Sequence, residues 1–123
     1  MLLHRDPSEA YRRVDFDARV VGADSRQLVD LCLEQVAGSV GRAIHAAQTG
    51  DNGAKSRALT RAVAALTALQ MGVDGNAPTG AALLQVYQSA RGAILDCVLN
   101  FDAVKLDRIR QDFIEIRQAM LGA

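Results

Sequence analysis

Residues 25–50 read SRQLVDLCLEQVAGSVGRAIHAAQTG, and this stretch decides the fold. At 3.6 residues per turn, one side of the helix it predicts is apolar, formed by Leu28, Val29, Cys32, Leu33, Val36, Ala37, Val40, Ala43, Ile44 and Ala47. These residues cover an arc of roughly 180°, whereas an ordinary surface helix shows about 100° or a little more. Leu31 lies apart, among the polar residues of the opposite side. So wide an apolar arc must contact several neighbours, which predicts the central helix of a bundle.

Three more helical segments follow, each introduced by a turn signal. The second runs from a cap at Asp51 to about Met71, and the third runs from Pro78 to about Asn100. The fourth begins after a cap at Asp102. Four long helices with short connections predict an all-α fold, an antiparallel four-helix bundle with a short N-terminal arm or helix. We expect one domain overall, with the arm at residues 1–24 and the bundle at residues 25–121.

Composition narrows the class of function. The 123 residues carry 14 basic and 14 acidic side chains, so no basic field favours nucleic acid. Polar residues interrupt the weakly charged stretch 62–90, so we expect no direct membrane insertion. The first residues, MLLHRD, lack the apolar run of a signal peptide. Cys32 and Cys97 are interpreted as free thiols of a cytoplasmic protein, with a disulfide or a metal pair as the alternative.

No catalytic or metal-binding pattern stands out in the sequence. A di-iron bundle would need Glu-x-x-His pairs on facing helices, and the chain has none. Asp30 and Glu34 are four residues apart on the polar side of their helix, which predicts a solvated acidic face rather than an acid/base pair. His45, on the same side, is also predicted to be solvated. We therefore expect no enzymatic activity, no cofactor and no bound metal.

The predicted helices differ in how much apolar surface they carry. The fourth has a narrow seam of about 80°, formed by Leu106, Ile109, Phe113, Ile116 and Met120. The first and third have more apolar surface than two neighbours can cover. One alternative is that the arm and the small residues absorb this surplus. The others are a groove for an apolar partner segment and an interface between two copies of the chain.

A set of short segments also recurs in the order and spacing of one known family. The segments are Ala10-Tyr11 with Val14, Ala23, Ser25, Gln27-Leu28-Val29, Gly50-Asp51, Ala54-Lys55, Ala58-Leu59, Ala62 and Tyr87. Together they resemble the FliS family of flagellar export chaperones over about residues 10 to 120. The chain departs from the family at Arg26, where a proline is usual, and at residues 72–80, GVDGNAPTG, which replace an acidic double-glycine turn. Met120 stands near the position of a common tryptophan.

The resemblance implies a cytoplasmic chaperone that binds the disordered C-terminal segment of flagellin. It would prevent premature polymerisation and deliver flagellin to the flagellar type III export gate, so flagellin and the gate are the expected partners. The candidate flagellin-binding residues are Tyr11, Val14, Leu28, Leu31, Cys32, Leu84, Tyr87 and Leu95. A self-associating structural bundle, or an adaptor without flagellin cargo, is the alternative. The apolar set Tyr11, Val14 and Phe16 predicts an arm that covers the groove edge and shifts when cargo arrives, or else a fixed capping turn.

Overall fold

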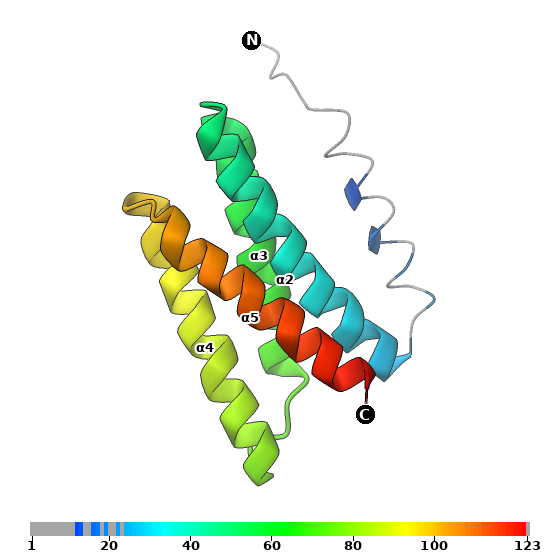
Figure 1. Cartoon of the computed structure of the whole chain (residues 1–123). Coiled ribbons are helices and arrows are strands. Elements are labelled where there is room, and N and C mark those ends of the chain that lie inside the picture. The colour runs from blue at the N-terminus through cyan, green and yellow to red at the C-terminus, as the bar shows by residue number, and fades with distance from the viewer. Residues whose placement is uncertain (1–11, 14–15, 18, 20–21, 23, 123) are drawn as a thin grey trace.

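The computed structural model describes residues 12–13, 16–17, 19, 22 and 24–122 (Figure 1). Its long helices are α2 (Ser25–Gln48), α3 (Asn52–Met71), α4 (Pro78–Leu99) and α5 (Ala103–Leu121). The described residues 12–13, 16–17 and 19 of the arm are also helical. Consecutive long helices run antiparallel, and no strand occurs in the described part of the chain. The predicted antiparallel four-helix bundle is confirmed.

Aspartate side chains cap the starts of three helices, including the caps predicted at Asp51 and Asp102. Asp24 accepts a hydrogen bond of 2.9 Å from the backbone N–H of Gln27, whose side chain accepts one of 2.9 Å from the N–H of Asp24. Asp51 and Asp102 cap α3 and α5 in the same way, through their carboxylates. Gly50 has a φ of +74°, a left-handed conformation that glycine adopts without strain. The turns are therefore specified locally.

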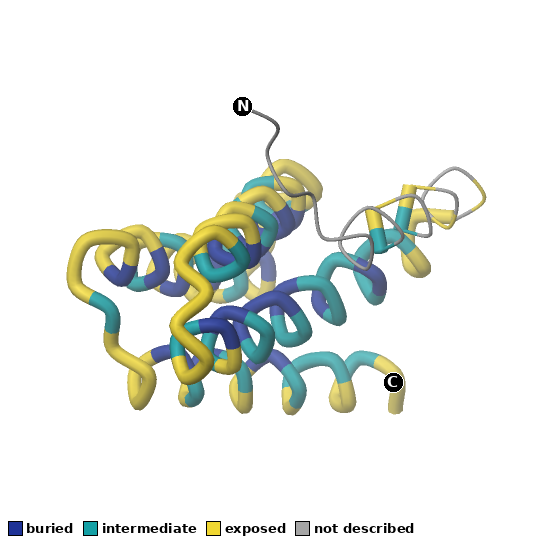
Figure 2. Tube along the Cα trace, turned by 90° about the horizontal axis from the view of Figure 1, so that it is seen from above, coloured by how far each residue is buried: buried dark blue, intermediate teal, exposed yellow. Residues whose placement is uncertain are grey.

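The core lies between the four helices, whose buried residues face inward in Figure 2. Its fully enclosed side chains include Leu33, Val36, Val40, Leu59, Leu66, Tyr87, Ile94, Cys97, Leu106 and Phe113. The rings of Tyr87 and Phe113 pack against each other across α4 and α5, with centroids 6.1 Å apart. Of the seam predicted for the last helix, Leu106, Ile109 and Phe113 are buried, and Ile116 and Met120 are half-buried against the core.

The bundle is open at one end. α2 packs extensively against α3 and α5, and α4 packs against α3, but α4 and α5 make the fewest contacts of any neighbouring pair. Figure 1 shows α4 and α5 close together at their connecting turn and diverging away from it. The start of α4 and the end of α5 therefore lie apart, at the end where α2 begins. This divergence leaves room for a cavity between the helices.

The prediction of a solvated acidic face on α2 was wrong, because α5 packs against that side. Arg117 of α5 donates to both carboxylate oxygens of Asp30, at 2.6 and 3.1 Å. Its nitrogen Nη2, which donates to Asp30 Oδ2, also lies 3.1 Å from Oε2 of Glu34. A Cβ at Gly41 would lie 3.4 Å from the Arg110 side chain, an ordinary van der Waals contact. Ion pairs thus make the polar side of α2 an interhelical contact.

Leu31 is buried, which corrects its predicted place among solvated polar residues; 6% of its surface is exposed. The reason is the N-terminal arm. Arg19 of the arm donates a hydrogen bond of 3.0 Å to Glu34, and Phe16 lines a hollow together with Leu28. Leu31 lies between Leu28 and Glu34 on the surface of α2, so the arm packs over it.

In the described part of the chain, no helix has the length and apolar character that a membrane span requires.

Candidate functional site

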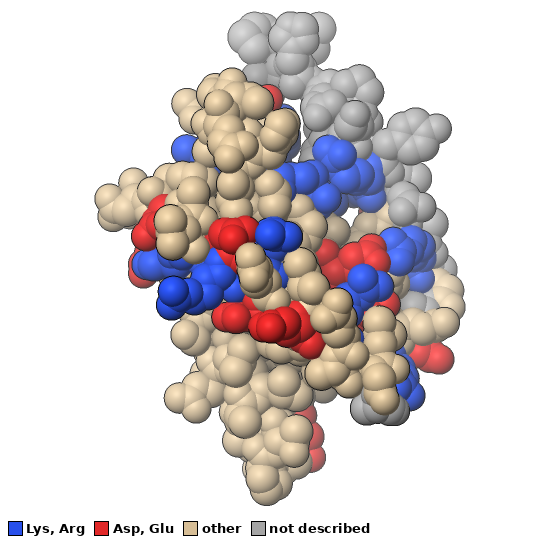
Figure 3. Space-filling model, in the orientation of Figure 1, with Lys and Arg blue, Asp and Glu red and all other residues tan. Residues whose placement is uncertain are grey.

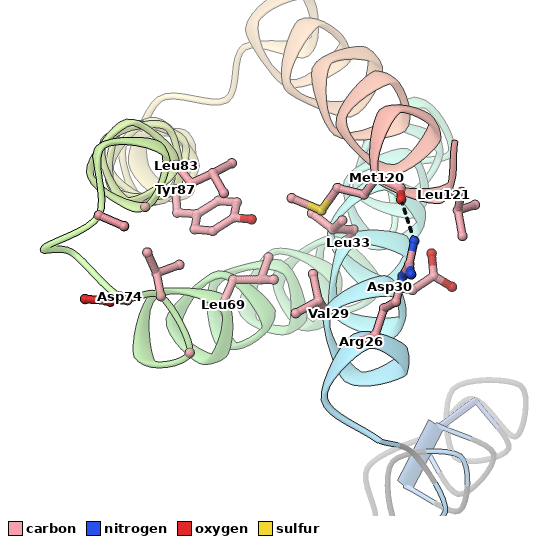
Figure 4. Close-up of a pocket in the computed structure, with 14 residues that line it drawn as sticks. Arg26, Val29, Asp30, Leu33, Leu69, Asp74, Leu83, Tyr87, Met120 and Leu121 are labelled. Carbon is pink, nitrogen blue, oxygen red and sulfur yellow. Dashed lines mark hydrogen bonds between the residues drawn. The ribbon is translucent and has the colours of Figure 1, made fainter. Parts of the chain in front are cut away.

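A cavity of about 450 Å³ occupies the open end of the bundle (Figure 4). All four long helices contribute to it, together with the loop between α3 and α4. Its apolar lining includes Val29, Leu33, Leu69, Val73, Leu83, Tyr87 and Met120. Such a concave, mostly apolar site with a few polar groups is the usual form of a binding pocket.

Tyr87 places a hydroxyl group in this cavity. Its side chain extends from α4 toward Met120 of α5, as Figure 4 shows. Burial raises the pKa of the Tyr87 hydroxyl, and the neighbouring Cys32 thiol adds to this effect. The hydroxyl therefore stays protonated at neutral pH and can donate a hydrogen bond.

Two contacts shape the cavity rim. Gly80, in the first turns of α4, is buried so closely against the preceding loop that a Cβ there would overlap the backbone carbonyl of Asp74. This packing holds the loop against one wall of the cavity. On the other side, the Arg26 guanidinium donates a hydrogen bond of 3.2 Å to the carbonyl oxygen of Met120. That bond fastens the end of α5 to the start of α2.

A second hollow, of about 680 Å³, lies between the N-terminal arm and the α2–α3 surface. Arg13, Phe16 and Asp17 line it from the arm. The residues on the bundle side are Ser25, Leu28, Val29, Cys32, Gln35, Thr60, Arg61, Ala64, Ala65, Ala68, Leu69 and Gly72. Burial raises the pKa of the Cys32 thiol, so it is protonated and apolar in character at neutral pH. We call this hollow the arm groove.

The arm groove and the end cavity adjoin each other. Val29, Leu69 and Gly72 line both, so the two hollows meet across the start of α2 and the end of α3. Together they form one apolar track that leads from the α2–α3 surface into the open end of the bundle. The surplus apolar surface that the sequence predicted for the first helix lies along this track.

Ion pairs fix the elements on either side of the track. Glu34 lies 3.0 Å from Arg19 of the arm and 3.1 Å from Arg117 of α5. The hydrogen bond from Arg117 holds the pKa of the Asp30 carboxyl below its usual range, and the same bond raises the pKa of Arg117. Two carboxylates of α2 therefore hold both the arm and the end of α5.

The described residues contain no group of three or more His, Cys, Asp or Glu side chains arranged to hold a metal ion.

A family model described as "Flagellar protein FliS" matches residues 7–121, nearly the whole chain. The chain belongs to the FliS family. FliS proteins are flagellar export chaperones and not enzymes, which supports a chaperone role for this member. No curated protein sequence matches the chain.

The candidate residues predicted for this FliS chain fall in different places. Leu28 and Cys32 line the arm groove, and Tyr87 lies in the end cavity. Leu84 and Leu95 line neither hollow; Leu84 lies near the loop at Gly75, and Leu95 is exposed. Leu31 is buried and lines neither hollow. The remaining candidates, Tyr11 and Val14, lie outside the described residues.

Sequence reasoning missed several lining residues, among them Leu69, Val73 and Met120. Leu69 and Met120 belong to the apolar seams of their helices, where they read as ordinary core positions. The divergence of α4 from α5 changes this end of the core into a cavity wall. The spacing of apolar residues within one helix does not indicate the angle between two helices.

Proposed function

We propose that this chain is a cytoplasmic chaperone that binds the disordered C-terminal segment of flagellin. It prevents premature polymerisation and delivers flagellin to the flagellar type III export gate. Membership of the FliS family supports the role of an export chaperone. The observation that carries flagellin binding is the apolar track formed by the arm groove and the end cavity.

The track suits a segment that becomes helical as it binds. An amphipathic helix buries residues spaced three and four apart in a groove of this kind. Such a segment would lie along the arm groove beside Leu28 and Cys32, in place of Phe16. It would then pass Gly72 and insert an apolar side chain into the end cavity, where Tyr87 donates a hydrogen bond. Ordering of the segment opposes binding, so the burial of apolar surface must supply the affinity.

Matched charge substitutions test whether the track is the binding site. Leu28→Asp places a carboxylate in the arm groove, and Leu83→Asp places one in the end cavity. The control is Ile114→Asp, at a half-buried position in another hollow between α2 and α5, which shares only Leu121 with the end cavity. Affinity is measured by fluorescence anisotropy with a labelled peptide from the flagellin C-terminus, after circular dichroism has verified that each variant is folded.

We expect each track variant to bind the peptide at least tenfold more weakly, a loss of about 1.4 kcal/mol or more. The Ile114→Asp variant should bind within about threefold of the unmodified chain, which is less than 1 kcal/mol. Equal losses in all three variants, or no loss in the two track variants, would show that the peptide binds elsewhere.

The chaperone part of the proposal needs a separate measurement. Seeded polymerisation of the cognate flagellin is followed by light scattering, with and without an equimolar amount of this chain. We expect the chain to suppress filament growth and the Leu28→Asp variant to suppress it less. Unchanged growth in the presence of the unmodified chain would contradict a role in preventing polymerisation.

A further inference from the structure

The outer side of α4 carries an apolar surface that the track does not use. Leu95, Val98 and Leu99 are 42%, 55% and 88% exposed. A Cβ at Gly92 would meet no atom within 4 Å, so the surface there is open. α4 lies at an edge of the bundle in Figure 1. None of these residues lines either hollow.

Charge is sparse on this helix. Residues 75–90 contain no charged side chain, and α4 as a whole has two, Arg91 and Asp96. In Figure 3 the charged side chains gather across the middle of the face, over α5, and the lower part over the first turns of α4 is mostly uncharged. A neutral surface with exposed leucines is typical of a place where another protein binds.

The spacing on this side follows a heptad. Gln85, Gln88, Gly92, Leu95 and Leu99 are separated alternately by three and four residues, which forms a seam along one line of the helix. The seam lies opposite the buried Cys97, so it faces outward. Arg91 immediately precedes one seam position, and Asp96 immediately follows the next. The two charges therefore lie on opposite flanks of the seam, five residues apart. Arg91 also donates a hydrogen bond of 3.1 Å from Nε to the Thr67 hydroxyl of α3, which leaves its two terminal nitrogens for other acceptors.

This arrangement is complementary to itself in one orientation. When two such helices pair in parallel, the residue before a seam position faces the residue five positions later on the partner helix. Arg91 of one copy then meets Asp96 of the other, and the two-fold axis forms the pair twice. In an antiparallel pair, like flanks meet, so Arg91 would face Arg91. We propose that two copies of this chain form a parallel dimer through the outer side of α4.

The dimer is expected to be weak. The seam from Gln85 to Leu99 is 15 residues long, or about 22 Å at 1.5 Å per residue. Two leucines and two glutamines leave it with a modest apolar area, below the roughly 1,600 Å² of a standard stable interface. We expect a dissociation constant on the order of 100 µM, a range typical of transient contacts. The interface does not depend on flagellin binding, because it leaves the arm groove and end cavity free.

Charge exchange tests the pairing. Sedimentation velocity from about 10 µM to 1 mM measures the dissociation constant of the unmodified chain and of variants. Asp96→Arg and Arg91→Glu should each weaken the dimer at least tenfold, because each brings like charges together. The double variant should recover to within about threefold of the unmodified chain, because its pairs are restored in reverse. Asp112→Arg, the same charge change at an exposed site on α5, is the control and should have no effect.

Disulfide trapping tests the orientation. In a parallel dimer each seam position meets itself, so Gln88→Cys and Leu99→Cys should both cross-link to a covalent dimer on oxidation. Glu115→Cys, exposed on α5, should cross-link no more than the unmodified chain with its two native cysteines. A chain that remains monomeric up to 1 mM would overturn the proposal. So would a dimer in which the double charge exchange fails to restore association, or in which the two seam cysteines do not cross-link.

Discussion

Two glycines of α4 should respond in opposite ways to the same substitution. At Gly92 an added methyl group meets no atom within 4 Å, whereas at Gly80 it overlaps the backbone carbonyl of Asp74 and approaches Val73 to 3.3 Å. Both residues lie in the same helix and have ordinary negative φ angles. Gly80→Ala and Gly92→Ala therefore differ mainly in packing against the α3–α4 loop.

The magnitudes follow from two opposing terms. Alanine favours a helix interior over glycine by about 1 kcal/mol, and Gly92→Ala should gain most of this. Gly80→Ala gains the same propensity but must displace backbone atoms of the loop, and overpacking of this kind costs about 1–3 kcal/mol, occasionally more. We expect a net loss of about 1–2 kcal/mol at Gly80. At about 4 °C per kcal/mol for a domain of this size, the melting temperature should rise by about 3–4 °C for Gly92→Ala and fall by about 4–8 °C for Gly80→Ala.

Thermal melts followed by circular dichroism at about 5 µM compare the two variants below the concentration at which the α4 dimer forms. The loop displaced by Gly80→Ala also lines the end cavity, so this variant should bind flagellin peptide more weakly while Gly92→Ala binds normally. Melting temperatures that shift by the same amount and in the same direction would refute the close packing of the loop on Gly80.

Three further predictions concern other parts of the molecule. Asp30→Asn should destabilise the bundle by about 1 kcal/mol at pH 7, because the pair with Arg117 is partly exposed to solvent. Arg117 lowers the folded-state pKa of Asp30, so the ionised carboxylate stabilises the fold. The stability difference between the unmodified chain and the variant should therefore have its full size above the ordinary aspartate pKa of about 3.9, and it should vanish in melts at progressively lower pH. Ile109→Asp should abolish the cooperative melt, because it buries an unpaired carboxylate in the α5 seam; a native melting temperature would contradict that seam. Deletion of residues 1–19 should leave the bundle helical, increase the binding of a hydrophobic dye by exposing Leu31, and change the affinity for cargo; unchanged dye binding and affinity would exclude a covering arm.

The sequence predicted most of the fold because its signals are local. The carboxylates of Asp24, Asp51 and Asp102 cap the helices that follow them, and each needs only its own chain neighbours to do so. The apolar periodicity of the four helices also predicted core residues, including Phe113 in the narrow seam of α5. Family membership was predicted from short matches over about residues 10 to 120, and a family model that matches residues 7–121 confirms it.

The arrangement of the polar side of α2 could not be predicted in this way. Asp30 and Glu34 look solvated on an isolated helix, but Arg117 makes that side compatible with packing against α5. Leu31 likewise looks exposed until the arm covers it. The end cavity depends on the angle between α4 and α5, which the spacing of residues within either helix does not contain. Interactions between distant segments, rather than local propensity, decided each of these features.

The central claim is that this chain binds the C-terminal segment of flagellin along the apolar track, with folding of the segment coupled to binding. Isothermal titration calorimetry at several temperatures tests it most directly, with the cognate flagellin segment titrated into the full chain. We predict a favourable enthalpy opposed by ordering entropy, and a large negative heat-capacity change from burial of apolar surface. Absence of binding heat at tens of micromolar at every temperature, corresponding to an affinity of roughly 7 kcal/mol or weaker, would contradict the claim.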